Sequence, residues 1–491
     1  MKNALKINPG DTVAVALAPL EPGMAIQGMT LLQQIPAGHK FALTDMAAGT
    51  SVVKYGFPIG VASRDIPVGE WVHEHNLVTA LSGCEKYLYR PELTSVEQME
   101  DGRTFMGYLR PDGHAGIRNE LWIIPTVGCV NGIAEHLATA IRSEGLPESI
   151  EAVVVYQHPY GCSQLGADHA ATQKILANLV RHPNAGGVLV LGLGCENNTM
   201  ASFQALVGPV EGDRVQFLVA QEVEDEVEEG LKILRRLRDA AAKNRRQALP
   251  LSMLNIGLKC GGSDAFSGLT ANPLVGAVSD LLIARGGSAV LTEIPEVFGA
   301  EEILFARCRD EEVFQKAVSV VNDFKAYFMS HGEPVGENPS PGNKAGGITT
   351  LEEKSLGCVQ KGGKAPLNDA LRYGDSIRCS GLSLLEGPGN DIVAVTALAA
   401  SGCQLVIFTT GRGTPLGGPV PVLKVATTSA LAEHKKNWID FNAGGLLEGE
   451  SLDALAESLL NVVSETASGR LTCSERMNVR DFAIWKRGVT L

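Results

Sequence analysis

The sequence predicts an α/β protein in which a small β-rich N-terminal unit precedes α/β domains with mainly parallel sheets. The chain has 491 residues, more than one hydrophobic core usually serves. Its 55 glycines and few aromatic residues suit many tight turns between strands and loops. From residue 107 onward, apolar runs of strand length alternate with helical patterns. This alternation is typical of parallel sheets that helices cover on both faces.

The N-terminal unit is expected to span residues 1–83. Short apolar runs such as 12–17 and 51–55 are separated by turns rich in Gly and Pro, for example at 36–40. Residues 84–106 are polar and irregular, and we interpret them as a linker.

Two α/β domains are expected to follow, at residues 107–250 and 251–491, the second completing the active site. The predicted strands are 121–129, 152–156, 187–195, 215–219, 254–260, 405–409 and 422–426. A helical pattern near 452–466 closes the chain. The polar stretch 332–363 is expected to be a functional or mobile loop.

Composition excludes several classes of protein. The net charge of −13 argues against binding to nucleic acid or to an anionic membrane surface. No signal-peptide core follows the N-terminus, and no apolar run reaches the roughly 18 residues that span a bilayer. We therefore expect a cytoplasmic protein, in which the 10 cysteines are thiols or metal ligands. The expected partner is a small molecule, and a homo-oligomer is left open.

Four cysteines each end a predicted strand: Cys129, Cys162, Cys195 and Cys260. The carboxyl ends of parallel strands share one edge of a sheet, so thiols distant in sequence can meet there. Such a set suits iron, zinc or an iron–sulfur cluster. The alternative is that each is a buried core residue, as free cysteines commonly are.

Histidines provide a second possible metal site. His73 and His75 would point to the same face of a strand, and His39 in a nearby turn offers a third ligand for one divalent cation. The alternative is an exposed polar strand edge. Lys40 and His158, each beside one of these clusters, are candidate acid or base groups.

Further polar groups suit binding of an acid. Arg110 and Arg118 precede a buried strand, and arginine recognises carboxylates in a bidentate manner, although solvated loop charges would have the same composition. Asn343 and Lys344 offer donors to hydroxyls. Arg412 lies in a glycine-rich turn whose backbone N–H groups can bind an anion.

Longer motifs resemble the altronate/galactarate dehydratase family. They are 107–120, 126–131, 160–164, 194–197, 259–264, 338–344 and 411–415. The first 80 residues resemble the small β-clip (SAF) domain that begins these enzymes, and the terminal residues 488–491 also match.

The resemblance implies a hydro-lyase that removes water from a hexonate with the help of ferrous iron. The altronate branch fits best, which implies conversion of D-altronate to 2-dehydro-3-deoxy-D-gluconate in hexuronate catabolism. The alternatives are dehydration of galactarate, elimination of sulfite from a sulfonated hydroxy acid, and a non-catalytic sugar-acid binding protein.

Dehydration requires a base for the α-proton, a cation for the developing enediolate and an acid for the leaving hydroxyl. A histidine site (His39, His73, His75) would hold Fe²⁺ or Mn²⁺, whereas a thiolate site (Cys129, Cys162, Cys195, Cys260) would favour an iron–sulfur cluster. The candidate acid and base groups are Lys40, His158 and His39. The candidate substrate-binding residues are Arg110, Arg118, Asn343, Lys344 and Arg412.

Overall fold

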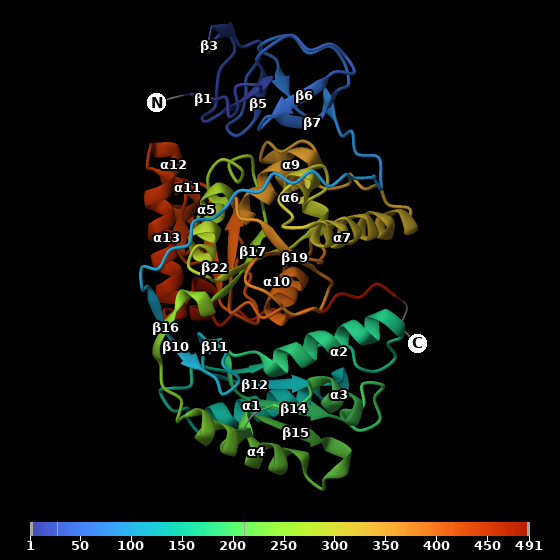
Figure 1. The fold of residues 1–491 in the computed structure, drawn as a ribbon, viewed down its shortest axis with the longest axis vertical. Helices are drawn as coiled ribbons and strands as arrows, with labels where there is room; N and C mark the ends of the chain where they lie inside the picture. Colours follow the sequence, from blue (N-terminus) through green and yellow to red (C-terminus); the bar gives the residue numbers. More distant parts are fainter. Residues whose placement is uncertain (1–2, 27, 211, 489–491) are drawn as a thin grey trace.

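The computed structural model describes residues 3–26, 28–210 and 212–488. Residues 489–491 of the terminal motif lie outside the described residues. The long axis of the molecule carries, in order, the N-terminal β domain, a seven-stranded sheet and a four-stranded sheet (Figure 1). Among the described residues, no helix is long and apolar enough to cross a membrane.

The N-terminal domain consists of short antiparallel strands, as the sequence predicted. One sheet has the order β1-β2-β5-β8, comprising Ala4–Leu5, Val13–Ala16, Lys40–Ala42 and Trp71–Val72. The other, β6-β7-β9, comprises Ser51–Lys54, Phe57–Ala62 and Leu77–Val78. A small pair joins β3 (Ala25–Ile26) to β4 (Met29–Thr30).

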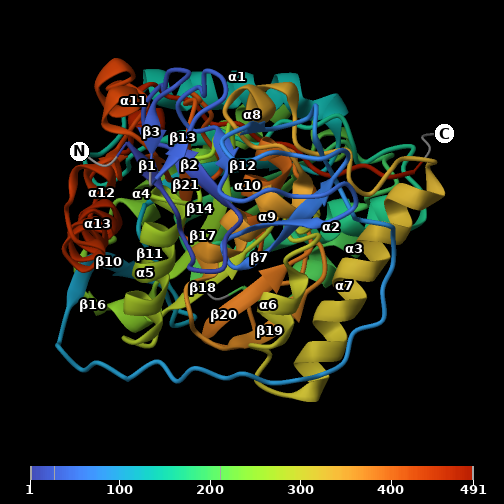
Figure 2. The same ribbon diagram turned by 90° about the horizontal axis from the view of Figure 1, so that it is seen from above.

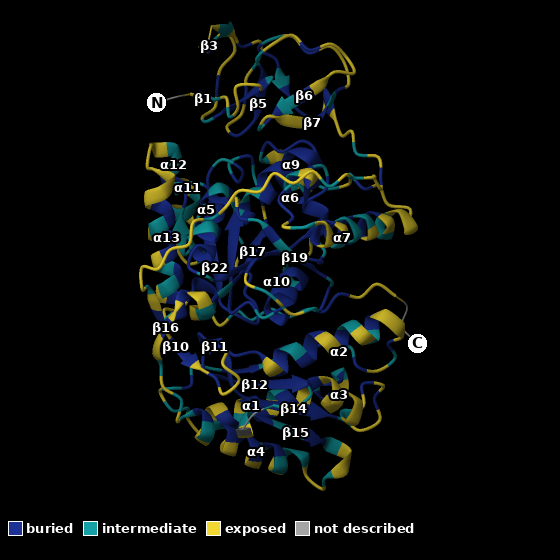
Figure 3. Ribbon diagram, viewed as in Figure 1, coloured by how far each residue is buried: buried dark blue, intermediate teal, exposed yellow. Residues whose placement is uncertain are grey.

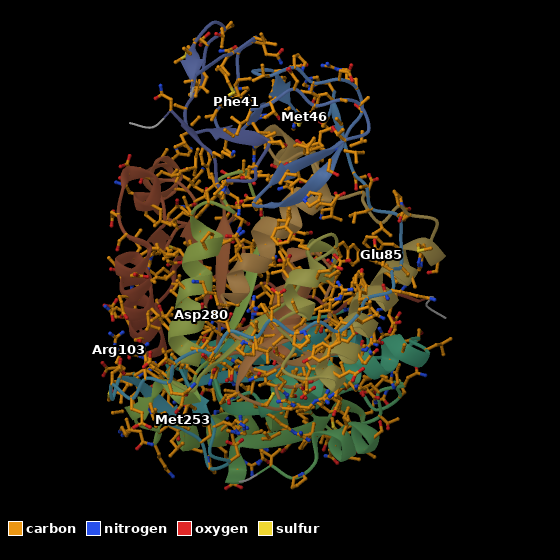
Figure 4. The ribbon with its side chains drawn as sticks, turned by 45° about the horizontal axis from the view of Figure 1, so that its top comes forward. Phe41, Met46, Glu85, Arg103, Met253 and Asp280 are labelled. Carbon is orange, nitrogen blue, oxygen red and sulfur yellow. The ribbon has the colours of Figure 1, made fainter. Side chains whose placement is uncertain are left out.

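An extended segment connects this domain to the rest of the chain. Glu85 and Arg103 lie on opposite sides of the molecule, so the segment crosses its whole width (Figure 4). It is held to the C-terminal part by Tyr87, whose hydroxyl donates to Glu301 at 2.5 Å. Strand β10 (Thr104–Leu109) begins before the expected linker ends, and pairs antiparallel with β11 (Ala115–Gly116) and β16 (Gln247–Pro250).

The four-stranded sheet is entirely parallel, in the order β13-β12-β14-β15: Val153–Val155, Glu120–Pro125, Ala185–Gly192 and Val215–Val219. Every residue of β12 and β14 is buried, which explains their continuous apolar runs. Helices α1 (Asn131–Ser143) and α4 (Glu226–Ala241) share one core with one face of this sheet. Helices α2 (Gly166–Arg181) and α3 (Met200–Val207) cover the other face.

The seven-stranded sheet is also parallel throughout. Its order is β19-β20-β18-β17-β21-β22-β23: Leu367–Leu371, Gly381–Leu385, Ser288–Leu291, Asn255–Cys260, Leu405–Thr410, Val422–Ala426 and Phe441–Asn442. Strands β17 and β22 are buried (Figure 3). The main helices around it are α5 (Ala271–Ile283), α7 (Glu311–Ser330), α10 (Asp391–Ala400) and α13 (Leu452–Ala467). Shorter ones are α6 (Glu301–Phe305), α11 (Ser429–His434), α12 (Gly445–Glu448) and α14 (Cys473–Arg476).

The polar stretch 332–363 is more ordered than the sequence suggested. It contains α8 (Pro341–Ala345) and α9 (Leu351–Cys358). All eight residues of α9 are buried, because the N-terminal domain packs on this helix through β7 (Figure 2). The charged residues Glu353 and Lys354 of this helix are tolerated in the interior because each forms an ion pair. For this reason a helix with a polar sequence is buried.

Candidate active site at two sheet edges

Six of the motifs gather in two groups of three, each at the carboxyl edge of one parallel sheet. We call residues 126–131, 160–164 and 194–198, which follow β12, β13 and β14, the cysteine edge. We call residues 259–264, 338–344 and 411–415 the covered edge, because it lies beneath the N-terminal domain at the end of β17 and β21.

A buried ion triad joins the N-terminal domain to the covered edge. Glu353 of α9 accepts from Lys40 at 2.8 Å and from Lys54 at 2.7 Å, and all three side chains are fully buried. Burial would raise the pKa of Glu353, but the two ammonium groups hold it at about 2. Burial also lowers the pKa of Lys40 to about 8, despite the opposing effect of Glu353. Lys40 is therefore a cation at neutral pH that can lose its proton readily.

His39 and His73 lie beside this triad, with ring centroids 4.9 Å apart. His73 Nδ1 bonds Thr349 Oγ1 at 2.7 Å, and burial lowers the pKa of His73 to about 4. His39 Nδ1 accepts from Trp71 Nε1 at 3.2 Å, and its Nε2 donates to the carbonyl oxygen of Ala345 at 3.4 Å. Both nitrogens of His39 are engaged, so it has no lone pair free for a metal or a substrate proton.

The predicted histidine metal site does not form. His75 lies against Trp71, is partly exposed and has its Nε2 3.7 Å from Glu70. Among the described residues, the three histidines do not bring three ligand atoms within 4.8 Å of one another. The hydrogen bonds that engage both nitrogens of His39 and the packing of His75 against Trp71 are the physical reason.

A small cavity of about 10 Å³ lies between the N-terminal domain and the covered edge. Its wall includes Lys54, Ser263, Asp264, Glu353 and Lys354. The Asp264 carboxylate accepts from Ser267 and Thr427, yet burial raises its pKa to about 6. A Cβ at Gly411 would lie within 2.5 Å of all three carboxyl atoms, so this turn must be glycine for Asp264 to sit here. Asp264 is thus a carboxyl group that can exchange a proton near neutral pH.

The predicted substrate-binding residues of the C-terminal domain do lie at this edge. The Asn343 side chain donates to the carbonyl oxygen of Ser263 at 2.7 Å and accepts from Lys354 at 3.3 Å. Lys344 pairs with Glu74 of the N-terminal domain at 2.7 Å and stays partly exposed. Arg412 is exposed at the rim, where its guanidinium donates to the carbonyl oxygen of Gly342 at 3.3 Å. The rim therefore carries two cations that solvent can reach.

The cysteine edge differs in being open. Cys129, Cys162 and Cys195 are all exposed, each on one of three loops that hydrogen bonds tie together. The backbone N–H of Gly128 donates to the carbonyl oxygen of Tyr160 at 2.9 Å, and that of Asn198 to Gly161 at 3.0 Å. The three loops therefore meet, but among the described residues their three Sγ atoms do not all lie within 4.8 Å of one another, so the convergence of the thiols stays a prediction.

Two buried amide atoms at the cysteine edge have no partner among the described residues: Asn131 Oδ1 and Gln164 Nε2. Each belongs to a loop that carries a thiol. A buried polar atom without a partner is uncommon in a native fold. Asn131 Oδ1 and the three exposed thiols can serve as ligands to a bound group, whereas Gln164 Nε2 can only donate a hydrogen bond to it.

Cys260 does not join the other three cysteines. It is buried at the covered edge, on the other sheet, with Cys358 and Glu296. The prediction that all four cysteines lie at one sheet edge is therefore wrong for Cys260, because the strands before the four cysteines belong to two separate sheets.

The arginines near the start of the first α/β domain are structural rather than substrate-binding. Arg118 has no exposed side-chain surface and forms a bidentate pair with Glu475 at 2.7 and 2.9 Å. Its other donors reach backbone carbonyls, and the buried Arg110 likewise donates to the carbonyl oxygens of Pro183 and Arg118 and to Asn119. Arg118 has no donor left for a substrate carboxylate, and Arg110 is buried with three of its five donors engaged inside the protein.

His158 is also structural. It is buried, its Nε2 bonds the carbonyl oxygen of Pro125 at 2.8 Å, and its Nδ1 accepts from the backbone N–H of Tyr160. Burial lowers its pKa to about 4. With both nitrogens engaged, it positions the loop of Cys162 and has no free nitrogen for proton transfer.

Sequence reasoning missed Glu353, the pairing of Lys54 with it, and the particular role of Asp264. Asp264 closes the motif 259–264, which was itself recognised. Glu353 and Lys54 are 299 residues apart, and nothing in the local sequence of either indicates the other. Two buried lysines sharing one carboxylate are recognised only in three dimensions.

A three-part architecture with a polar site between its parts defines a class of multidomain α/β enzymes. Three family models match this chain in turn. The altronate/galactarate dehydratase SAF domain matches residues 2–80, and the second domain of D-galactarate dehydratase/altronate hydrolase matches 107–242. The C-terminal D-galactarate/altronate dehydratase domain matches 251–490. The chain belongs to the altronate/galactarate dehydratase family.

Three relatives are similar over nearly their full lengths. Altronate dehydratase of Escherichia coli is 51% identical over 99% of each chain, and altronate dehydratase of Bacillus subtilis is 52% identical over 100% of each. Galactarate dehydratase (L-threo-forming) of Escherichia coli is 35% identical over 95% of this chain and 93% of its own. The two altronate enzymes are thus clearly more similar to this chain than the galactarate enzyme.

Proposed function

We propose that this protein is a hydro-lyase that converts D-altronate to 2-dehydro-3-deoxy-D-gluconate and water. The observation that carries the proposal is the 51–52% identity, over the full chain, to two altronate dehydratases, against 35% to a galactarate dehydratase. We further propose a cytoplasmic role in hexuronate catabolism, where the cysteines stay reduced.

The covered edge is the proposed place of proton transfer. Arg412 and Lys344 at the rim would hold the carboxylate of the sugar acid, since both are cations at the exposed end of the site. Asp264, with a pKa of about 6, would accept the α-proton. Lys40, with a pKa of about 8, would donate a proton to the departing hydroxyl once a domain shift breaks one of its three hydrogen bonds to Gly347, Thr349 and Glu353. The two groups are thus in opposite protonation states near pH 7, as an elimination requires.

Entry of substrate requires the N-terminal domain to shift. The cavity of about 10 Å³ has room for about one water molecule, whereas ligand pockets usually exceed about 300 Å³. The two domains meet here through the Lys40–Glu353–Lys54 triad, so this contact would open and close around the substrate. Closure would exclude water from the reaction.

Iron is the cofactor that the family resemblance implies, and the two candidate ligand sets fit it differently. The histidine set does not fit either Fe²⁺ or Mn²⁺, because His39 has no free nitrogen and, among the described residues, the three histidines do not bring three ligand atoms within 4.8 Å of one another. The thiols of the cysteine edge suit an iron–sulfur cluster by their chemistry, but among the described residues their three Sγ atoms do not all lie within 4.8 Å of one another, so they do not form a preorganised site for a single ion. We propose that Cys129, Cys162 and Cys195 hold the iron. A Lewis acid acts only on atoms that it contacts, so iron bound there would not polarise a substrate held by Asp264 and Lys40 at the covered edge, which belongs to the other sheet.

The decisive experiment is anaerobic turnover of D-altronate by the purified protein, with Fe²⁺ added and then chelated. Formation of the 2-keto-3-deoxy acid is expected with D-altronate at a kcat/KM at least tenfold above that with galactarate or with a sulfonated hydroxy acid. If the protein turns over galactarate or the sulfonated hydroxy acid faster than D-altronate, that acid is the substrate instead. Absence of turnover with all three acids would refute the enzyme assignment.

The iron site is tested separately by metal analysis of Cys162→Ser. The variant is expected to lose most of its iron while keeping its thermal stability, because Cys162 is exposed. Cys84→Ser is the matched control, since Cys84 is also exposed but lies in the connecting segment. Full iron content in Cys162→Ser would place the metal elsewhere.

A further inference from the structure

A second group of thiols lies buried at the covered edge, apart from the cysteine edge. Cys260 at the end of β17 and Cys358 at the end of α9 have their Sγ atoms 3.4 Å apart. Both are within reach of Glu296 Oε2, at 2.9 and 3.2 Å. Lys361 Nζ lies 3.0 Å from Cys260 Sγ, and Lys354 Nζ lies 2.8 Å from Glu296 Oε1. We call these five residues the thiol cluster.

The charges in the thiol cluster balance without a metal. Cys260, Glu296 and Cys358 form the one group within the described ranges with three such ligand atoms inside 4.8 Å. However, two ammonium groups already contact Cys260 and Glu296, so a divalent cation would add charge that nothing offsets. Three acidic groups and two lysines leave one acid protonated. That acid is Cys358, whose pKa is raised by its hydrogen bond with Cys260 and by burial.

The cluster makes Cys260 a reactive thiol. The hydrogen bond with Cys358 and the nearby Lys361 lower its pKa below the usual range for a thiol, and a thiolate is the nucleophilic form. The other buried cysteines behave oppositely: burial raises the pKa of Cys308 and of Cys403 to about 12. Cys260 is thus the thiol of this pair that ionises more readily, with the Cys358 thiol 3.4 Å away.

We propose that Cys260 and Cys358 form a reversible disulfide when the protein meets hydrogen peroxide. The Cys260 thiolate attacks one peroxide oxygen, the O–O bond breaks, and the leaving oxygen takes a proton to become water. The Cys358 thiol then attacks the sulfur of the Cys260 sulfenic acid. The S–S bond forms, the S–O bond breaks, and a second water leaves. In sum, two thiols and one hydrogen peroxide give one disulfide and two waters.

The geometry allows both steps. The sulfur atoms must approach from 3.4 Å to about 2.05 Å, a movement that the last turn of α9 can absorb. Cys358, but not Cys260, lines the cavity of about 10 Å³, which has room for about one water molecule, so peroxide reaches Cys260 only when the N-terminal domain shifts. A larger oxidant such as a glutathione disulfide would not fit there.

The disulfide would alter the covered edge. Helix α9 carries both Cys358 and Glu353, so pulling its end toward β17 disturbs the triad with Lys40 and Lys54. Oxidation also removes the thiolate that Lys361 balances. We therefore expect lower dehydratase activity in the oxidised protein, a consequence that rests on the proposed function, whereas the disulfide itself does not.

The test uses the reduced full-length protein, treated anaerobically with stoichiometric hydrogen peroxide, quenched, alkylated under denaturing conditions and digested for mass spectrometry. A peptide pair joining Cys260 to Cys358 with the loss of two hydrogens is expected, and dithiothreitol should release it. The two thiols should disappear at least tenfold faster than those of Cys308 and Cys403. The wild-type measurement needs no variant and so does not depend on any substitution folding.

Variants then identify the attacking sulfur. In Cys358→Ser, Cys260 is expected to accumulate as a sulfenic acid that dimedone traps. Cys403→Ser is the matched control, because it removes a buried thiol with no partner cysteine and should leave the linked peptide unchanged. The proposal is overturned if Cys260 and Cys358 stay alkylatable while the exposed cysteines oxidise. It is equally overturned if purified protein holds a metal that blocks both thiols.

Discussion

The two sheet edges of this protein carry the same kind of motif but are built on opposite principles. At the covered edge, charges from distant segments are buried and paired, as in the Lys40–Glu353–Lys54 triad. At the cysteine edge, three thiols on neighbouring loops stay exposed. Burial shifts pKa values strongly at the first edge, which suits proton transfer. Exposure of soft ligands at the second suits capture of a metal.

The largest expected effect is the loss of activity when a catalytic residue of the covered edge alone is changed. Asp264→Asn should lower kcat by roughly 10²- to 10⁴-fold, because the amide cannot accept a proton. Its iron content should stay that of the wild type, since Asp264 and the cysteines lie on different sheets. Turnover and metal analysis on the same sample check both points. If Asp264→Asn loses its iron together with its activity, the covered edge and the cysteine edge belong to one site rather than two.

The next effect concerns stability. Glu353→Gln leaves two buried ammonium groups without a counter-charge, and removing one partner from a buried ion pair costs roughly 3–5 kcal/mol. Denaturant unfolding measures this loss. Glu352→Gln is the matched control on the same helix, because Glu352 accepts only from the neutral groups of Thr79 and Ala80. Equal losses in the two variants would contradict a special role for the triad.

The two edges also differ in how far the sequence reveals them. The cysteine edge was predicted because Cys129, Cys162 and Cys195 each follow a glycine at the end of an apolar run, and such runs identify buried parallel strands. The covered edge was predicted only in part. Lys40, Asn343 and Arg412 were recognised, but Glu353 lies in a stretch that was expected to be a loop.

Burial and long-range pairing explain the remaining errors. Arg118 was interpreted as a substrate-binding residue because a sequence shows charge but not exposure. Its partner, Glu475, is 357 residues away. The parallel sheets and the β-rich N-terminal domain, by contrast, follow from local patterns of apolar residues and turns, and the structure confirms them.

The pH dependence of kcat/KM tests whether proton transfer takes place at the covered edge, and its expected effect is of intermediate size. If Asp264 is the base, kcat/KM should fall tenfold per pH unit below about pH 6, where the carboxylate is protonated. If Lys40 is the acid, kcat/KM should fall above about pH 8, where the ammonium group loses its proton. Metal binding at the cysteine edge should not move either limb. An acid limb that persists unchanged in the residual activity of Asp264→Asn would assign it to another group.

The smallest expected effect is at the rim. Arg412→Lys keeps the positive charge but loses the planar fork that binds a carboxylate through two hydrogen bonds, so KM should rise about tenfold with little change in kcat. Steady-state kinetics with D-altronate measure this split. Arg245→Lys is the matched control, because Arg245 is exposed and bonds only backbone carbonyls of residues 242 and 244. An unchanged KM in Arg412→Lys would mean that the substrate carboxylate is held elsewhere. A fall in kcat instead would place Arg412 against the reacting atoms, because only an interaction made in the transition state lowers kcat.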